Sequence, residues 1–189
     1  MFYHASPVSG IQTLMPRPSD GGKTLLWFSV KRENVLVYLV NAIERFCRET
    51  GYAPNGPIPK WGPYGFTKDG LLQIQEYYPN ALTEAYAGAS GYIYAVETIV
   101  PSDLPLRIRD SAVTEHPARV AACEFVPDAL EAILAAEREG RLSVLRYEDA
   151  PEKIDAFNRS VIPDEYRNGS PAYRYFLRAK FPAFCPAEE

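Results

Sequence analysis

Apolar residues in the first half of the chain follow the periods of strands and of one helix. Residues 2–6 predict a short strand. Residues 24–30 (TLLWFSV) are a continuous apolar, β-prone run of the kind found in strands covered on both faces. Between 33 and 49, apolar side chains recur every three or four residues, which predicts a helix over these residues with Gly51 just past its end. Residues 91–99 (GYIYAVETI) alternate in the manner of another strand.

The second half of the chain again alternates between strand and helix patterns. Residues 119–126 predict a strand, 127–139 a helix, and 142–147 a further strand. We expect residues 150–189 to form a C-terminal helical extension. No internal repeat is visible, so the pattern predicts an α+β protein with a single domain over residues 1–189.

A long aromatic loop is expected between the two halves. Residues 52–70 are rich in proline and glycine and carry Trp61, Tyr64 and Phe66. Long loops with aromatic side chains are typical of binding lids, and the same side chains equally suit packing against a core. The segment is therefore a candidate lid.

Composition and charge narrow the class of protein. The chain has 189 residues, 47% of them hydrophobic, which is enough for a sizeable core. Its net charge of −4 argues against a dedicated binder of nucleic-acid backbones, although a local basic groove is compatible with it. The three cysteines and two histidines lack the local spacing of a zinc site. With no visible signal peptide or membrane span, we expect a cytoplasmic protein with no membrane partner.

The candidate chemistry lies near the N-terminus. His4 stands inside the first expected strand, and a histidine there can donate from one ring nitrogen while a neighbour fixes the other. The small Ala5 would let a planar ligand approach the backbone. Tyr38 follows Trp27 by eleven residues and would offer a ring for stacking. Each of these residues also has an ordinary structural interpretation, as a strand histidine or a core aromatic.

Two further residues suit a phosphorylated ligand. Arg17 lies between Pro16 and Pro18, which would hold it in an extended loop, and a guanidinium matches phosphate oxygens bidentately. A solvated loop charge is the alternative interpretation. Ser6 would either hydrogen-bond a ribose or cap a turn.

These features resemble the ADP-ribosyltransferase fold, in the branch that includes diphtheria toxin and the poly(ADP-ribose) polymerases. Members begin with a strand carrying Tyr-His or Phe-His and a small residue, and an aromatic-rich second strand leads into a helix whose tyrosine stacks on nicotinamide. The resemblance covers residues 1–50 and, more weakly, 80–100. It implies a split β-sheet core that binds NAD as a substrate, with Trp27 where the family usually has tyrosine. The positions that match the family are His4, Trp27 and Tyr38. Together with Ala5, Ser6 and Arg17 they are the candidate NAD-binding residues.

The family also uses a glutamate near the start of a later strand, where the carboxylate supports an oxocarbenium-like transition state as nicotinamide leaves. The matching strand here opens with Gly91. The candidates are Glu84, in a short helix expected over 79–87, and Glu97, inside the strand; we favour Glu84. The third alternative is that neither glutamate serves. The expected catalytic residues are His4, Tyr38 and Glu84.

The resemblance implies a transferase of the glycosyltransferase class that moves ADP-ribose from NAD to an unknown acceptor, protein or nucleic acid, or that hydrolyses NAD. One alternative is an NAD-dependent RNA 2′-phosphotransferase-like enzyme, which relies on histidine and arginine without the late glutamate. Another is a non-catalytic interaction domain that uses the aromatics around Trp61 and Tyr64. The acceptor, the oligomeric state and the role of residues 101–189 stay open.

Overall fold

The computed structural model describes residues 1–18, 22–56, 58–104 and 108–187. Contacts within the chain define two units. Both contain helices and strands, so the α+β class predicted from the sequence is confirmed, while the extent of a single domain stays a prediction. Unit 1 consists of Met1–Val40, Phe66–Leu72 and Gly88–Ser143, and unit 2 of Asn41–Gly65, Gln73–Ala87 and Val144–Glu189.

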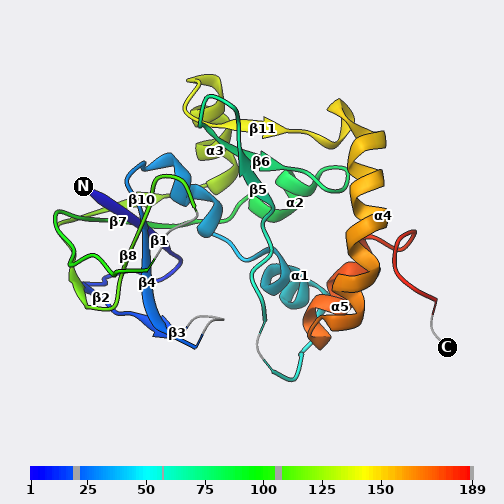
Figure 1. Cartoon of the computed structure of the whole chain (residues 1–189), viewed down its shortest axis with the longest axis horizontal. Helices are drawn as coiled ribbons and strands as arrows, with labels where there is room; N and C mark the ends of the chain where they lie inside the picture. The colour runs from blue at the N-terminus through cyan, green and yellow to red at the C-terminus, as the bar shows by residue number, and fades with distance from the viewer. Residues whose placement is uncertain (19–21, 57, 105–107, 188–189) are drawn as a thin grey trace. The chain divides into compact units, whose positions relative to one another are not determined.

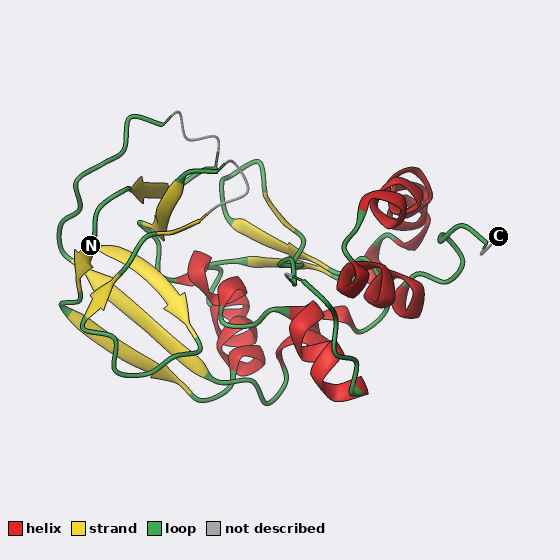
Figure 2. Cartoon of the chain, turned by 90° about the horizontal axis from the view of Figure 1, so that it is seen from below, coloured by secondary structure: helices red, strands yellow, loops and turns green. Residues whose placement is uncertain are grey.

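Unit 1 is built on a six-stranded sheet in the order β10-β7-β1-β4-β3, with β8 also paired to β4 (Figures 1 and 2). Its pairs are antiparallel, and β1 pairs with β7 along its whole length, from Phe2↔Val96 to Ser6↔Tyr92. A separate two-stranded sheet joins β2 to β9. The strands are β1 (Phe2–Ser6), β2 (Thr13–Leu14), β3 (Arg17–Pro18), β4 (Thr24–Ser29), β7 (Gly91–Val96), β8 (Ser111–Thr114), β9 (Ala118–Arg119) and β10 (Ala122–Val126).

One face of this sheet carries a hydrophobic core. Leu26 and Phe28 of β4 and Tyr94 and Val96 of β7 stand two residues apart on their strands, so the pleat turns both pairs to the same side. Tyr94 is fully buried, and its hydroxyl donates to the Val8 carbonyl at 2.6 Å. The apolar runs of the sequence form strands here because their side chains supply the buried face of the sheet.

The helix expected over 33–49 is two helices in the structure, so that prediction is wrong. A 3-10 helix, η1 (Glu33–Tyr38), is followed by α1 (Ala42–Thr50). Asn41 separates them in an extended conformation, and its side chain accepts a hydrogen bond from the Ile43 backbone at 3.2 Å. Asparagine favours helix starts because its side chain satisfies an N–H that lacks a partner in the helix. The break puts Tyr38 in unit 1 and α1 in unit 2.

Unit 2 is mainly helical. Helices α1, α4 (Pro151–Asn168) and α5 (Pro171–Lys180) pack around a shared core that includes Ile43, Ile162 and Phe176 (Figure 1). The two last helices lie within residues 150–189, where a C-terminal helical extension was expected, and they contribute to the core of unit 2; residues 188 and 189 lie outside the described residues. None of the helices in the described part of the chain is long and apolar enough to cross a membrane.

The remaining elements include a second sheet, ordered β11-β6-β5. Its strand β5 falls inside the segment expected to be a loop at 52–70, so the loop prediction is wrong there; Pro57 of that segment lies outside the described residues. Trp61 packs on Tyr78, with ring centroids 5.8 Å apart, and on Phe176 at 5.0 Å. These contacts support packing of this aromatic against the core of unit 2. The elements are β5 (Tyr64–Phe66), β6 (Leu72–Gln75), α2 (Ala81–Tyr86), α3 (Ala129–Arg138), β11 (Ser143–Leu145) and η2 (Tyr147–Asp149).

A buried carboxylate joins three elements of unit 2. Glu76, which follows β6, is 5% exposed, and its two oxygens accept hydrogen bonds from the backbones of Leu82 at 2.8 Å and Tyr147 at 3.2 Å. Its own N–H donates to the Leu145 carbonyl at 2.9 Å. Because a buried carboxylate is costly unless its oxygens accept such bonds, Glu76 fixes α2 and η2 against the sheet.

We predict that Glu76→Gln lowers the free energy of unfolding by about 1–3 kcal/mol, because the amide nitrogen turns one acceptor into a donor that faces an N–H. Urea denaturation followed by circular dichroism measures this change. Glu152→Gln, at an exposed position of α4, is the matched control and should change stability by less than about 0.5 kcal/mol. Equal stability of the two variants would contradict this role of Glu76.

Candidate functional site

The central strands β1 and β4 separate after a single residue pair. In the described chain their register consists of Tyr3↔Ser29 alone. A ladder continued from this pair would place Ala5 opposite Trp27, but no such pair forms. Instead, the His4 side chain reaches the Trp27 carbonyl oxygen, with Nδ1 2.9 Å from it. A side chain thus takes the place that a backbone N–H would have in a continuous sheet.

This contact fixes the tautomer of the His4 ring. A carbonyl oxygen only accepts, so Nδ1 must carry the proton and donate. In the neutral ring Nε2 is then an acceptor. The ring also meets the buried Phe28 edge to face, with centroids 6.0 Å apart, so both its direction and its tautomer are set by β4.

Ala5 and Ser6 complete β1 and are both buried. The Ser6 hydroxyl accepts a hydrogen bond from the Val8 backbone N–H at 3.2 Å, which is the turn-capping role weighed for it from the sequence. Ala5 pairs with Ile93 of β7, whereas toward β4 the register of β1 has already ended at Tyr3.

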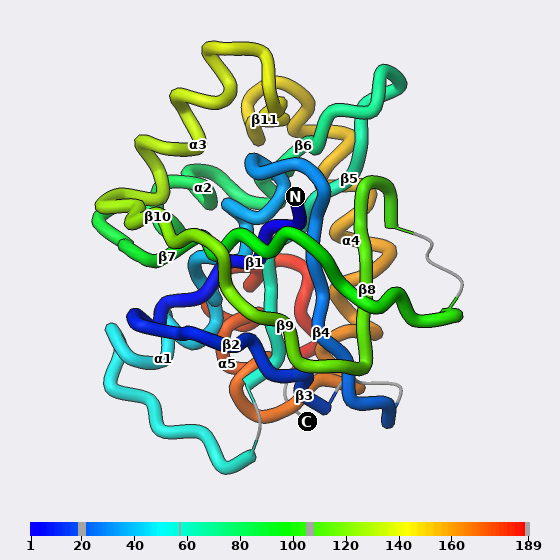
Figure 3. The backbone as a smooth tube through the Cα atoms, turned by 90° about the vertical axis from the view of Figure 1, so that its left-hand side faces the viewer, coloured from blue at the N-terminus to red at the C-terminus, as the bar shows by residue number. Residues whose placement is uncertain are grey.

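Trp27 lies in the part of β4 that is no longer paired with β1, and Arg17 lies in β3, which pairs with β4. Leu26 and Phe28 on either side of Trp27 are buried, whereas Trp27 is 40% exposed; side chains alternate along a strand, so Trp27 belongs to the opposite face. Figure 3 shows β8 beside this strand. The exposed Arg17 of β3 pairs with Leu25, two residues before Trp27. Arg17 and Trp27 therefore belong to two paired strands, and Trp27 itself pairs with Val113 of β8.

Tyr38 ends η1 and is half-buried. The next residue, Leu39, lies close to the end of β1, because a Cβ built on Gly91 would stand 2.8 Å from Leu39 Cδ2 and 3.2 Å from the Ser6 carbonyl oxygen. Tyr38 is therefore next in sequence to a residue that contacts the β1 and β7 strand ends. The same crowding explains why Gly91, and no glutamate, opens β7.

An ion pair that the sequence did not suggest holds the start of η1. Arg32 Nε donates to Glu124 of β10 at 2.9 Å, and the guanidinium makes a second contact with the same carboxylate. The Arg32 hydrogen bond lowers the pKa of Glu124, and the carboxylate raises the pKa of Arg32 in turn. The partners are 92 residues apart, so local spacing gives no signal for this pair.

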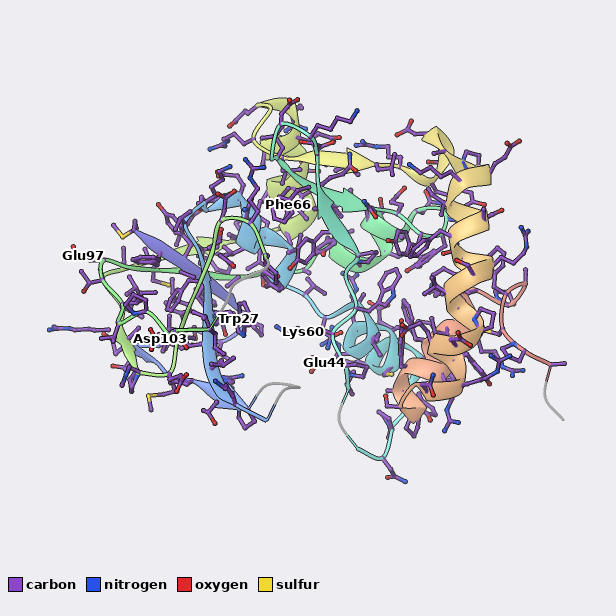
Figure 4. The ribbon with its side chains drawn as sticks, in the orientation of Figure 1. Trp27, Glu44, Lys60, Phe66, Glu97 and Asp103 are labelled. Atoms are coloured by element: carbon purple, nitrogen blue, oxygen red, sulfur yellow. The ribbon has the colours of Figure 1, made fainter. Side chains whose placement is uncertain are left out.

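Neither candidate glutamate is shown at the place where β1 and β4 separate. Glu97 lies elsewhere in unit 1, and Glu84 belongs to unit 2. Glu97 is exposed and follows Val96, which pairs with Phe2 at the beginning of β1, and Figure 4 shows it far from Trp27 within unit 1. Glu84 belongs to unit 2, where its carboxylate lies 2.5 Å from Lys180 Nζ. Unit 1 thus contains all the expected site residues except Glu84.

Comparisons with known proteins found no relative of this chain. No family model, no curated protein and no solved structure matches the chain. Among the described residues, no cluster of three or more histidine, cysteine, aspartate or glutamate side chains is arranged to hold a metal ion.

We predict that Arg32→Gln destabilises the protein by less than about 1 kcal/mol at pH 7, since Glu124 is half-exposed and solvent screens the pair. Because the folded pKa of Glu124 is lowered, the pair stabilises fully above the ordinary glutamate pKa of about 4.3, and this stabilisation is lost as the pH falls through the folded value. Urea denaturation of Arg32→Gln, Glu124→Gln and the double variant between pH 7 and 3 measures the coupling. A coupling that does not change with pH would contradict the assignment.

Proposed function

We propose that this protein binds NAD in unit 1, at the place where β1 and β4 separate. The observation that supports this most is the hydrogen bond from His4 to the Trp27 carbonyl, because it connects two of the residues that the family resemblance nominates and orients the imidazole. Arg17 and Tyr38 belong to elements that pair with or follow the same strand.

In this proposal each side chain has one role toward the dinucleotide. Nε2 of His4 accepts a hydrogen bond from a ribose hydroxyl. Tyr38 stacks on the nicotinamide ring, and Trp27 forms a further aromatic wall. Arg17 neutralises the pyrophosphate. The free thiols of Cys47, Cys123 and Cys185 suit the reducing cytoplasm, where we expect the protein to act.

The chemistry that follows is transfer of ADP-ribose to an acceptor, or to water. The bond between the ribose anomeric carbon and the nicotinamide nitrogen breaks, and nicotinamide leaves with the bonding electrons. The acceptor oxygen or nitrogen forms the new bond to that carbon and releases its proton to solvent. A carboxylate near the anomeric carbon would stabilise the positive charge that develops, the role that the sequence suggested for Glu84.

The first test compares three histidine variants by calorimetric titration with NAD. We predict that His4→Asn keeps the fold, because the asparagine amide can still donate to the Trp27 carbonyl, but weakens NAD binding about tenfold or more through loss of Nε2. His4→Ala should lose both the ligand contact and the strand contact. His116→Ala, which alters the other histidine at an exposed site, should bind NAD like the wild type. Equal affinity of all three variants, or no NAD binding by a folded wild type, would overturn the proposal.

The second test addresses Glu84 through release of nicotinamide. We predict that Glu84→Gln binds NAD normally but releases nicotinamide at least about 100-fold more slowly, since the amide does not stabilise a positive charge. Lys180→Met breaks the same ion pair and leaves the carboxylate in place, so it should retain release. If both variants release nicotinamide at the wild-type rate, the assignment of Glu84 fails while NAD binding stands.

A further inference from the structure

Unit 2 contains a pocket that the proposed function does not use. It has a volume of about 400 Å³, within the range of small-molecule sites. It opens beside α5, which contributes most of its lining. The lining residues are Tyr52, Tyr166, Pro171, Arg174, Tyr175, Arg178 and Ala179.

One wall of the pocket is a stack of aromatic rings. Tyr52 lies nearly parallel to Tyr175, with centroids 4.1 Å apart and 14° between the planes. Tyr175 in turn contacts Phe46 at 5.3 Å, so the two tyrosines continue a series of rings that begins in the core. Both tyrosines are half-buried, which gives a ligand ring a rigid surface on which to stack.

Two guanidinium groups lie on the same helix as this wall. Arg174 and Arg178 are one turn apart on α5, so their side chains share a face of the helix. Arg174 is exposed. Arg178 donates to the Tyr166 hydroxyl at 2.7 Å and stands over the Tyr166 ring, 5.1 Å from its centroid, which fixes the guanidinium at the pocket wall.

The charge of this pocket is opposite to that of the whole chain. The described lining residues include two arginines and no carboxylate, and α5 (PAYRYFLRAK) has three basic residues, of which Lys180 pairs with Glu84, and no acidic one. The complete chain has a net charge of −4. A local positive field next to stacked rings selects a ligand that has both an anion and a planar ring.

We propose that this pocket binds a nucleoside monophosphate unit, either free or within a single strand. The base stacks on the Tyr52–Tyr175 pair, and the phosphate lies against Arg174 and Arg178. Alternating aromatic and arginine side chains are how proteins hold single-stranded nucleic acids without reading their sequence. The parallel tyrosine pair favours a nucleotide over a phosphotyrosine peptide, because a base offers a larger flat face than a phenyl ring.

The experiment is titration of the folded protein with AMP, adenosine, a single-stranded oligoadenylate and a phosphotyrosine peptide. AMP should bind more tightly than adenosine because of the phosphate. Equal affinity for AMP and the oligonucleotide identifies a free nucleotide as the ligand, whereas tighter binding of the oligonucleotide identifies a strand. Failure of both AMP and the oligonucleotide to bind, or binding of the phosphotyrosine peptide alone, overturns the proposal.

Variants of the pocket separate stacking from charge. Tyr52→Ala should weaken AMP binding about tenfold, and Tyr52→Phe, which keeps the ring, should not. Arg174→Ala, at an exposed position, should weaken binding and reduce the slope of log affinity against log salt for the oligonucleotide by about 0.7. Arg167→Ala removes the same charge from α4 outside the lining, where Arg167 pairs with Asp164, and should leave both values unchanged. Equal effects of the two arginine variants would overturn the phosphate assignment.

The same variants keep this inference distinct from NAD binding in unit 1. Arg174→Ala should retain the wild-type affinity for NAD, and His4→Asn should retain that for AMP. A loss of NAD binding in Arg174→Ala, with normal binding in His4→Asn, would identify NAD as the nucleotide of this pocket. That result would support the pocket and refute the proposed site of NAD binding.

Discussion

The candidate site depends on one hydrogen bond, from His4 Nδ1 to the carbonyl of Trp27. Where two strands of a sheet separate, their backbone groups lose their partners, and such groups need a replacement. His4 supplies it from a side chain, so β1 and β4 can part after Tyr3↔Ser29 without an unsatisfied carbonyl at Trp27. The same bond fixes the imidazole tautomer, which determines what the ring can offer to a ligand.

The sequence predicted most clearly those elements whose signals are local. The strand over 2–6 was predicted with the boundaries that it has, because the proline and glycine residues that end it follow within a few positions. The helix over 33–49 was predicted as continuous because its apolar period runs through Asn41, whose capping role depends on a backbone conformation that the period does not encode. Long-range pairs such as Arg32 with Glu124 leave no trace in local spacing.

The candidate site was predictable to a similar extent. The order of His4, Trp27 and Tyr38 nominated residues that the structure places in unit 1, and the exposure of Trp27 distinguishes it from its buried neighbours Leu26 and Phe28. The catalytic glutamate was harder to assign, because Gly91 occupies the position at the start of β7 where the family has it. Leu39 and the Ser6 carbonyl lie too close to Gly91 for a larger side chain. Glu84 has Lys180 as its partner in unit 2, a contact between positions 96 residues apart.

The most direct measurement uses the fact that the chain has two histidines, His4 and His116. In protein labelled with nitrogen-15 in its histidines, the ring nitrogen signals report the tautomer and the surroundings of each residue separately. We predict that His4 shows a protonated Nδ1 and that NAD shifts its Nε2 signal while His116 stays unchanged. NAD that binds without moving the His4 signal, or a His4 ring protonated only at Nε2, would contradict the account.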